Sequence, residues 1–319
     1  MKKFGLILIL VFLSILLLFS AFWLGLLIAK CVVYPDYVKN KETVCKSPAI
    51  HDGFGPQGLT HAENETYIFS GYNGKAMELH LSENGIAKSV IAVDENGKQW
   101  EGHGGGVARV KDYVYVANDE KLIIFRLSDL QKAENGAKVA SIGTFPVDTA
   151  ASFCYADDSC IYVGEFYRAE DYEIDRSHAY TTPNGDEHRA LVSCYPLNPD
   201  GTVADTYPLY SISVTSQVQG FAVKDDTVVI SRSWGISSSK LEFYNGIKDS
   251  GTTINVSGKS VPLYYIDSSN LTKTVSMPAF SEDLTIVGDR VLVSFESACN
   301  KYIVGKFFFA DQVISYPLN

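Results

Sequence analysis

Positive charge, cysteine and helical periodicity are all scarce in this sequence of 319 residues. Its 27 lysine and arginine residues stand against 37 aspartate and glutamate residues, giving a net charge of −10 with no basic cluster. This balance argues against nucleic-acid binding and against docking of the domain on an anionic membrane surface. The six cysteines include no C-x-x-C pair and no zinc-site spacing with histidine. After residue 30, no apolar run of useful length has the helical period of 3.6 residues, which argues against a helical domain.

Two glycine motifs with known chemistry are incomplete. Residues 102–106, Gly-His-Gly-Gly-Gly, are similar to the oxyanion-hole segment of lipases, but the chain has no Gly-x-Ser-x-Gly nucleophile elbow. The same segment lacks the spacing of a nucleotide-binding loop and the helix that would follow one. We therefore predict a glycine-rich loop that approaches neighbouring backbone closely and presents His103.

The one long apolar run occupies residues 4–29, between Lys2-Lys3 and Lys30. Signal-peptide cores have about 7–15 apolar residues, and about 20 already span a bilayer, so residues 1–30 are predicted to be an uncleaved membrane anchor. The alternative is a long signal peptide whose removal would give a secreted protein. A lipoprotein signal at Cys31 is not favoured, because Lys30 stands where a small residue is expected. The positive-inside rule predicts a cytoplasmic N-terminus and a domain outside the cytoplasm.

A short sequence pattern recurs five times in the remainder of the chain. Each copy has an alternating apolar run, a turn, and a second β-branched or aromatic run that ends in a small residue. The copies begin at Gly58, Gly106, Ser152, Gly220 and Asp283. A strand–turn–strand unit repeated at this interval predicts a circular array of sheets. The longer third and fourth intervals predict insertions at residues 170–188 and 234–259.

The repeats resemble the β-propeller superfamily, in particular its NHL-, YVTN- and gluconolactonase-like members. The WD40 and kelch motifs are absent, and Val114-Tyr-Val-Ala-Asn118 comes closest to a YVTN motif. The resemblance implies an all-β fold over residues 55–319, with five blades favoured and six as the alternative. Residues 31–54 are predicted to be a juxtamembrane stalk. Third strands are expected in every blade, including residues 263–266 in the fourth and 302–309 in the fifth. Residues before Gly55 or the C-terminal segment must complete a shared blade.

The resemblance also implies which residues face the central channel. In a propeller the first strand of each blade lines the channel, so the start of that strand and the end of the second strand lie near its mouths. Polar residues at these positions are the candidate binding site: Gln57, His103, Asn118, Glu165, Gln219, Arg232, Glu282, Asp283 and Glu296.

Two chemistries are compatible with this set. Asn118, Glu165 and Glu296 offer the hard oxygen ligands of a cation such as Ca²⁺, as in some gluconolactonase-like propellers. Arg232 counts against a cation, and an ion-pair network of Arg232 with Glu165 or Glu296 is favoured over a metal. No cofactor is therefore favoured. A pair of carboxylates drawn from Glu165, Glu282, Asp283 and Glu296 could instead serve a glycosidase.

Aromatic residues gather in and near the two predicted insertions. Tyr172 and Trp234 are expected on a rim where they could contact a carbohydrate or a protein. Cys154 and Cys160 flank the turn of the third repeat, and a three-residue hairpin loop would place them opposite each other as a disulfide, which a non-cytoplasmic compartment permits. The favoured function is a membrane-anchored binding module outside the cytoplasm. The alternative is a propeller hydrolase, either glycosidase-like or a metal-dependent lactonase or phosphoesterase.

Overall fold

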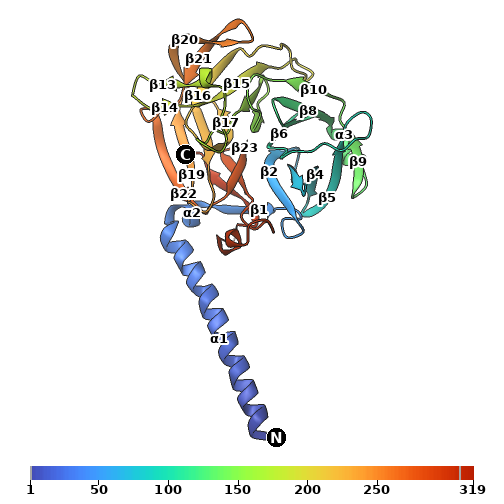
Figure 1. Cartoon of the computed structure of the whole chain (residues 1–319), viewed down its shortest axis with the longest axis vertical. Coiled ribbons are helices and arrows are strands. Elements are labelled where there is room, and N and C mark those ends of the chain that lie inside the picture. Colours follow the sequence, from blue (N-terminus) through green and yellow to red (C-terminus); the bar gives the residue numbers. More distant parts are fainter. Residues whose placement is uncertain (1, 309) are drawn as a thin grey trace.

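A helix of 32 residues, α1 (Lys2–Val33), leads into a ring of β-sheets in the computed structural model, which describes residues 2–308 and 310–319 (Figure 1). The segment Phe4–Val33 is long and apolar enough to cross a membrane, and its most apolar window is not buried against the rest of the chain. At 1.5 Å per residue α1 is about 48 Å long, against about 30 Å for the apolar core of a bilayer.

Five sheets form the ring. The first contains β2 (Phe54–His61), β3 (Thr66–Asn73), β4 (Ala76–Glu83), β5 (Ile86–Val93) and β9 (Ala137–Ala140), and the second β6 (Gly106–Val110), β7 (Tyr113–Ala117), β8 (Lys121–Arg126) and β10 (Gly143–Pro146). The third contains β11 (Phe153–Ala156), β12 (Cys160–Gly164), β15 (Ala190–Pro196), β16 (Tyr210–Val214), β21 (Lys259–Tyr265) and β20 (Lys248–Val256). The fourth contains β17 (Val218–Lys224), β18 (Thr227–Arg232), β19 (Ser239–Asn245) and β22 (Leu271–Met277), and the fifth β23 (Ser281–Val287), β24 (Arg290–Phe295), β25 (Gln312–Pro317) and β1 (Glu42–Lys46).

Several short elements lie outside the five sheets of the ring. The strands β13 (Tyr180–Thr181) and β14 (Glu187–His188) pair within the insertion of the third blade. The helices are α2 (Pro35–Asn40), α3 (Leu127–Lys132) and two 3₁₀ turns, η1 (Arg176–His178) and η2 (Val304–Phe308).

The innermost strands of the five sheets contact one another in the order β2, β6, β11, β17, β23 and back to β2. The chain is therefore a five-bladed β-propeller, as the repeats predicted. Glycines permit the close approach of these strands. A Cβ at Gly58 would lie 2.6 Å from the backbone nitrogen of Val107, and one at Gly106 would lie 2.4 Å from that of Cys154. Real side chains do not fit at such distances, so these copies of the repeat begin with glycine.

A buried carboxylate, Asp283, occupies the place of these glycines in the fifth blade. Its side chain is fully buried, and Oδ2 accepts the backbone N–H groups of Leu59 at 3.1 Å and Val107 at 3.4 Å. A Cβ at Gly220 would lie 3.0 Å from Oδ1. Asp283 of β23 therefore reaches the inner strands of three other blades. Burial raises the pKa of Asp283 well above its ordinary value, although the backbone N–H groups oppose that shift.

The ring is closed by both ends of the domain. Strand β1 pairs antiparallel with β25 at the outer edge of the fifth blade, so the stretch predicted as a stalk contains a strand of the propeller. The segment between α1 and β1 also packs on this blade. Tyr37 of α2 is buried against Phe295, with ring centroids 6.4 Å apart, and the Tyr316 hydroxyl donates to Asp36 at 2.8 Å. The propeller is consequently joined to α1 by folded structure.

Two predicted third strands were wrong. Residues 263–265 of the first run belong to β21, which runs parallel to β16 in the third sheet, and the third strand of the fourth blade is β19. An alternating apolar run has the same pattern in any sheet, so the pattern could not assign this strand. Residues 304–308 form the turn η2, and the third strand of the fifth blade is β25. Gly305 of η2 approaches Ser297 so closely that a Cβ would lie 2.4 Å from its carbonyl oxygen, so only glycine fits at this point of the turn.

The predicted Cys154–Cys160 disulfide is not formed, and all six cysteines are free. The register of β11 and β12 places Cys154 opposite Val163, because the side chain of Asp157 accepts the N–H groups of Ser159 and Cys160 and lengthens the turn. The two thiols also belong to different packed clusters of the core.

Candidate binding pocket

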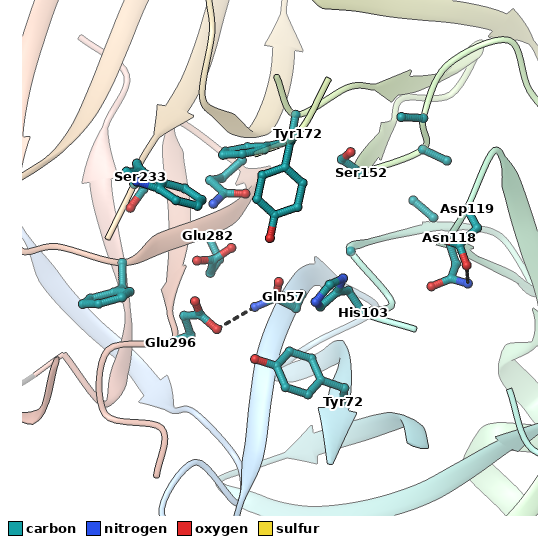
Figure 2. A pocket seen from close by; sticks show the side chains of 18 of the residues that line it. Gln57, Tyr72, His103, Asn118, Asp119, Ser152, Tyr172, Ser233, Glu282 and Glu296 are labelled. Atoms are coloured by element: carbon teal, nitrogen blue, oxygen red, sulfur yellow. Dashed lines mark hydrogen bonds between the residues drawn. The ribbon is translucent and has the colours of Figure 1, made fainter. Parts of the chain in front are cut away.

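A pocket of about 560 Å³ lies at one mouth of the central channel (Figure 2). All five blades contribute to it, through residues that start the innermost strands and residues that follow the second strands. Of the predicted candidates, those that line it are Gln57, His103, Asn118, Tyr172, Gln219, Trp234, Glu282 and Glu296. Polar and aromatic side chains together line it, and Figure 2 shows Glu282, Gln57, His103 and Tyr172 around the same cavity.

β-Bulges direct three of these side chains into the pocket. One-residue register shifts place Gln57 of β2, Gln219 of β17 and the pair Glu282–Asp283 of β23 at bulges. A bulged residue has no partner on the adjacent strand, and bulges near binding sites commonly redirect a side chain. In β23 the bulge lets two successive carboxylates serve different purposes. Glu282 lines the pocket, whereas Asp283 lies among the inner strands.

The backbone that enters the innermost strands is strained at three positions. Ala151, Gln217 and Phe280 have φ angles of 49°, 66° and 63°, a left-handed conformation that costs a non-glycine residue on the order of 1–2 kcal/mol. Ala151 and Phe280 line the pocket directly. Backbone strain of this kind persists where the surrounding structure fixes it and often occurs at functional sites.

An acid pair, Glu282 and Glu296, forms the floor of the pocket. Both side chains are almost fully buried, and each is close enough to affect the pKa of the other. Burial, followed by the charge of Glu296, raises the pKa of Glu282 well above its ordinary range, so Glu282 is the more readily protonated of the two. Burial raises the pKa of Glu296 to about 7, although Lys301 opposes that shift. Glu296 also accepts the amide of Gln57 at 2.8 Å (Figure 2).

A lysine and two tyrosines lie beside the acid pair. The Lys301 ammonium donates to the Tyr72 hydroxyl at 2.8 Å, and the Tyr302 hydroxyl is close enough to Tyr72 and Glu296 to affect the pKa of each. Lys301 also lies over both rings, 4.8 Å from the centroid of Tyr72 and 5.2 Å from that of Tyr302. Burial raises the pKa of both tyrosines, so each remains a neutral hydrogen-bond donor at physiological pH.

The glycine-rich loop presents His103 as predicted and needs its glycines. Gly102 and Gly104 have φ angles of 115° and 55°, and a Cβ at Gly105 would lie 2.1 Å from the carbonyl oxygen of Ser152. The His103 ring packs edge-on against Tyr72, with centroids 5.3 Å apart. Burial, followed by the charge of Lys301, lowers the pKa of His103, so its ring is neutral at pH 7. Asn118 holds this loop by accepting the N–H of Gly104 at 3.2 Å.

Three aromatic side chains of the pocket lining, Phe166, Tyr172 and Trp234, form an aromatic wall. Their ring centroids are 5.2 Å apart for Phe166–Tyr172, 5.7 Å for Tyr172–Trp234 and 5.9 Å for Phe166–Trp234. The Arg168 guanidinium lies 4.4 Å from the Trp234 ring centroid and so supports one end of the wall. Tyr172 is 46% exposed, which agrees with its predicted place on a rim.

Glu165 does not line the pocket, although its position in the repeat suggested that it would. Its carboxylate contacts Nδ1 of His178 at 2.9 Å and accepts the backbone N–H groups of Leu191 at 3.0 Å and Ala150 at 3.3 Å. Burial lowers the pKa of His178, but the bond to Glu165 outweighs it and the net pKa is raised. Glu165 therefore fastens the insertion of the third blade to its sheet.

Arg232 also has a different partner from the predicted ones. Its Nη1 lies 2.9 Å from Glu242 on β19 and its Nε donates to the carbonyl of Ser216 at 3.1 Å, so it pairs with neither Glu165 nor Glu296. The three proposed Ca²⁺ ligands are likewise not brought together, because Glu165 is bound to His178 and Asn118 to the glycine loop. Over residues 2–308 and 310–319, no group of three or more acidic, histidine or cysteine side chains is arranged to hold a metal ion.

Sequence reasoning missed the contribution of residues 280–302 outside the repeat. Phe280, Lys301 and Tyr302 line the pocket, and the rings of Phe280 and Tyr302 lie 4.8 Å apart. Lys301 directly precedes, and Tyr302 begins, the apolar run that was predicted to be a strand. No signal in the repeat pattern pointed to them.

Comparison with known proteins adds little to this description. No protein-family model matches the sequence, and no curated protein matches it significantly. Among solved structures it is similar to BamB from Moraxella catarrhalis (8% identity, 82% of this chain and 85% of that one, TM-score 0.34). It is also similar to the WD40 domain of coronin from Toxoplasma gondii (10% identity, 81% and 68%, TM-score 0.34). Such low similarity says nothing of what the chain does.

The acid pair makes the stability of the fold depend on pH. The pKa of Glu296 is raised in the folded chain, so folding is favoured while the carboxyl is protonated and this contribution is lost as pH rises from about 4.5 to about 7. At 1.36 kcal/mol per pKa unit the loss from Glu296 is of the order of 3 kcal/mol. Glu296→Gln should therefore reduce the fall in unfolding free energy over this range, measured by chemical denaturation in detergent. The control Glu173→Gln, at the pocket rim, should keep the full pH dependence. Identical profiles for Glu296→Gln and the unaltered chain would contradict the assignment.

Proposed function

We propose that this protein is a membrane-anchored binding module that captures a ligand at the pocket mouth of its channel. The observation that carries the proposal is the combination, in one cavity of about 560 Å³, of an aromatic wall with hydrogen-bonding groups from all five blades. Cavities of about 300–1,000 Å³ with apolar walls and a few fixed polar groups are typical ligand sites.

The chemistry of the lining favours a carbohydrate. A sugar ring has an apolar C–H face, which can stack on Tyr172 or Trp234, and hydroxyls that can donate to or accept from amides and carboxylates. Gln57, Gln219 and the acid pair supply such groups across the cavity. An anionic ligand is disfavoured by the charges of the lining. Glu173, Asp119 and Glu296 line the cavity, and Lys301 is the one lysine or arginine among the lining residues that the structure describes.

The acid pair does not favour the alternative of a glycosidase. Two-carboxylate glycosidases hold these groups about 5–5.5 Å apart for retention or about 6.5–9.5 Å apart for inversion, leaving room for the reacting centre or a water. Glu282 and Glu296 are both almost fully buried and interact as close neighbours, which suits a shared proton better than two separated catalytic groups. We infer that the pair binds and orients hydroxyl groups.

The anchoring part of the proposal rests on α1. Its length and composition suit a membrane span, and Tyr37 and Asp36 join it to the fifth blade through packed contacts. A propeller held in this way would keep its pocket close to the membrane. We assign the propeller to the non-cytoplasmic side, on the basis of Lys2 and Lys3 ahead of the span.

Replacing Trp234 by alanine should abolish most ligand binding without unfolding the domain. We would titrate the full chain in detergent with neutral hexoses and N-acetylated amino sugars and follow heat release. Loss of one stacking aromatic at a binding site costs about 1–2 kcal/mol or more, so the affinity for any sugar that binds should fall by roughly five- to thirtyfold or more. Tyr172→Ala should act in the same direction.

The matched control is Ile236→Ala, because Ile236 is 65% exposed two residues from Trp234 and does not line the pocket. This variant should bind as the unaltered chain does. Two results would count against the proposal. Either no sugar binds the unaltered chain, or binding is the same after Trp234→Ala. If Trp234→Ala or Tyr172→Ala unfolds the chain, these residues belong to the core.

The side of the membrane is tested by labelling intact cells with a membrane-impermeant amine reagent. Lys75 and Lys98 lie exposed in turns of the first blade and report on the propeller. They should be labelled before the membrane is permeabilised, as peptide mapping by mass spectrometry would show. Labelling only after permeabilisation would place the propeller in the cytoplasm. The test is needed because Lys39, Lys41 and Lys46 follow the span.

A further inference from the structure

The loop that follows β24 exposes large apolar side chains next to the anchor. In this loop Ile303 is 76% exposed, Val304 54% and Phe307 44%. We call these three residues the apolar tip. The loop is held from the other side, since the rings of Tyr302 and Phe308 pack on Phe280 with centroids 4.8 and 6.4 Å away. The apolar tip is therefore displayed on a fixed support.

The apolar tip touches α1 well inside its apolar segment. The ring of Phe307 meets that of Phe22 edge-on, with centroids 6.1 Å apart. Phe22 lies eight residues before Lys30, the first charged residue after the apolar run, which is about 12 Å along the helix. Figure 1 shows this loop as the dark-red turn at the foot of the ring, on the side of α1. If α1 spans a bilayer, a side chain in contact with Phe22 lies at the level of the membrane.

We propose that Ile303, Val304 and Phe307 insert into the bilayer beside α1, as a second point of attachment for the propeller. This inference rests on the proposed anchoring by α1. Lipid is what covers the apolar tip, because the tip is continuous with the lipid-facing surface of the helix at Phe22. Apolar side chains with aromatic neighbours suit the interface of a bilayer, where Phe19, Phe22 and Trp23 already form a cluster of edge-on rings.

Tethering explains how three residues suffice. A protein held at the membrane by α1 presents its loop at a high effective concentration, so the loop needs no membrane affinity of its own.

Insertion of the apolar tip would also affect the position of the pocket. Lys301 and Tyr302 line the pocket and directly precede Ile303. Insertion of the apolar tip would hold that wall of the pocket at the membrane surface and prevent the propeller from swinging about α1.

The test uses tryptophan fluorescence in the full chain, reconstituted into phosphatidylcholine vesicles. Phe307→Trp is made together with Trp23→Phe, which removes the tryptophan of the span. The matched control is Ile142→Trp in the same background, because Ile142 is 48% exposed between β9 and β10, which Figure 1 places away from α1. Vesicles of lipids with brominated acyl chains are compared with vesicles of unbrominated lipids, after flotation has shown that the chain is bound.

We expect bromine to quench the emission of Phe307→Trp and to leave the added emission of Ile142→Trp unchanged. A chain that floats with the vesicles but shows no quenching at position 307 would overturn the insertion and leave the anchor intact. A blue-shifted, unquenched emission would overturn the insertion and would indicate instead that another copy of the protein covers the apolar tip. A chain that does not float would overturn both the anchor and the insertion.

Discussion

The carboxylate of Asp283 is the contact on which the centre of this propeller depends. Innermost strands of a closed ring face one another across a narrow axis, where backbone N–H groups are shielded from water and lose stability if left without acceptors. Oδ2 of Asp283 accepts two of these groups, from Leu59 and Val107 in the first and second blades. The fifth blade thereby bonds to strands that are far away in sequence, and the chain closes around one buried carboxyl group.

The β-bulge that brings Asp283 to the axis also helps to form the binding pocket. The bulge in β23 separates Glu282 from Asp283, so that adjacent residues serve the channel mouth and the axis. Bulges at Gln57 and Gln219 turn two further side chains into the cavity. The pocket is thus assembled where the inner strands depart from regular pairing. Together with the aromatic wall, these departures give the cavity both polar and aromatic lining groups, which is the basis for assigning it a ligand with both polar and apolar faces.

The architecture could be predicted because one sequence pattern repeats along the chain. Five copies of one pattern predicted five blades, and equivalent positions in the copies predicted Gln57, His103, Gln219, Glu282 and Glu296 as neighbours in space. The same logic failed for Glu165 and Arg232. Their place in the repeat is equivalent, but His178 and Glu242, which bind them, come from an insertion and from a third strand that the repeat does not describe. Lys301 and Tyr302 were missed for a similar reason. The absent Cys154–Cys160 bond depended on a turn length that Asp157 sets through its side chain.

The most direct test compares Asp283→Ala with Asp283→Asn in the full chain, by unfolding free energy in detergent. Alanine leaves two buried N–H groups without an acceptor, at about 1–3 kcal/mol each, so we expect a loss of roughly 2–6 kcal/mol. Asparagine retains a carbonyl oxygen for both groups and should cost clearly less. Sugar binding, where present, should weaken with alanine and survive with asparagine, because the bulge also sets Glu282. Equal and small effects of the two substitutions would contradict the central role of this carboxylate.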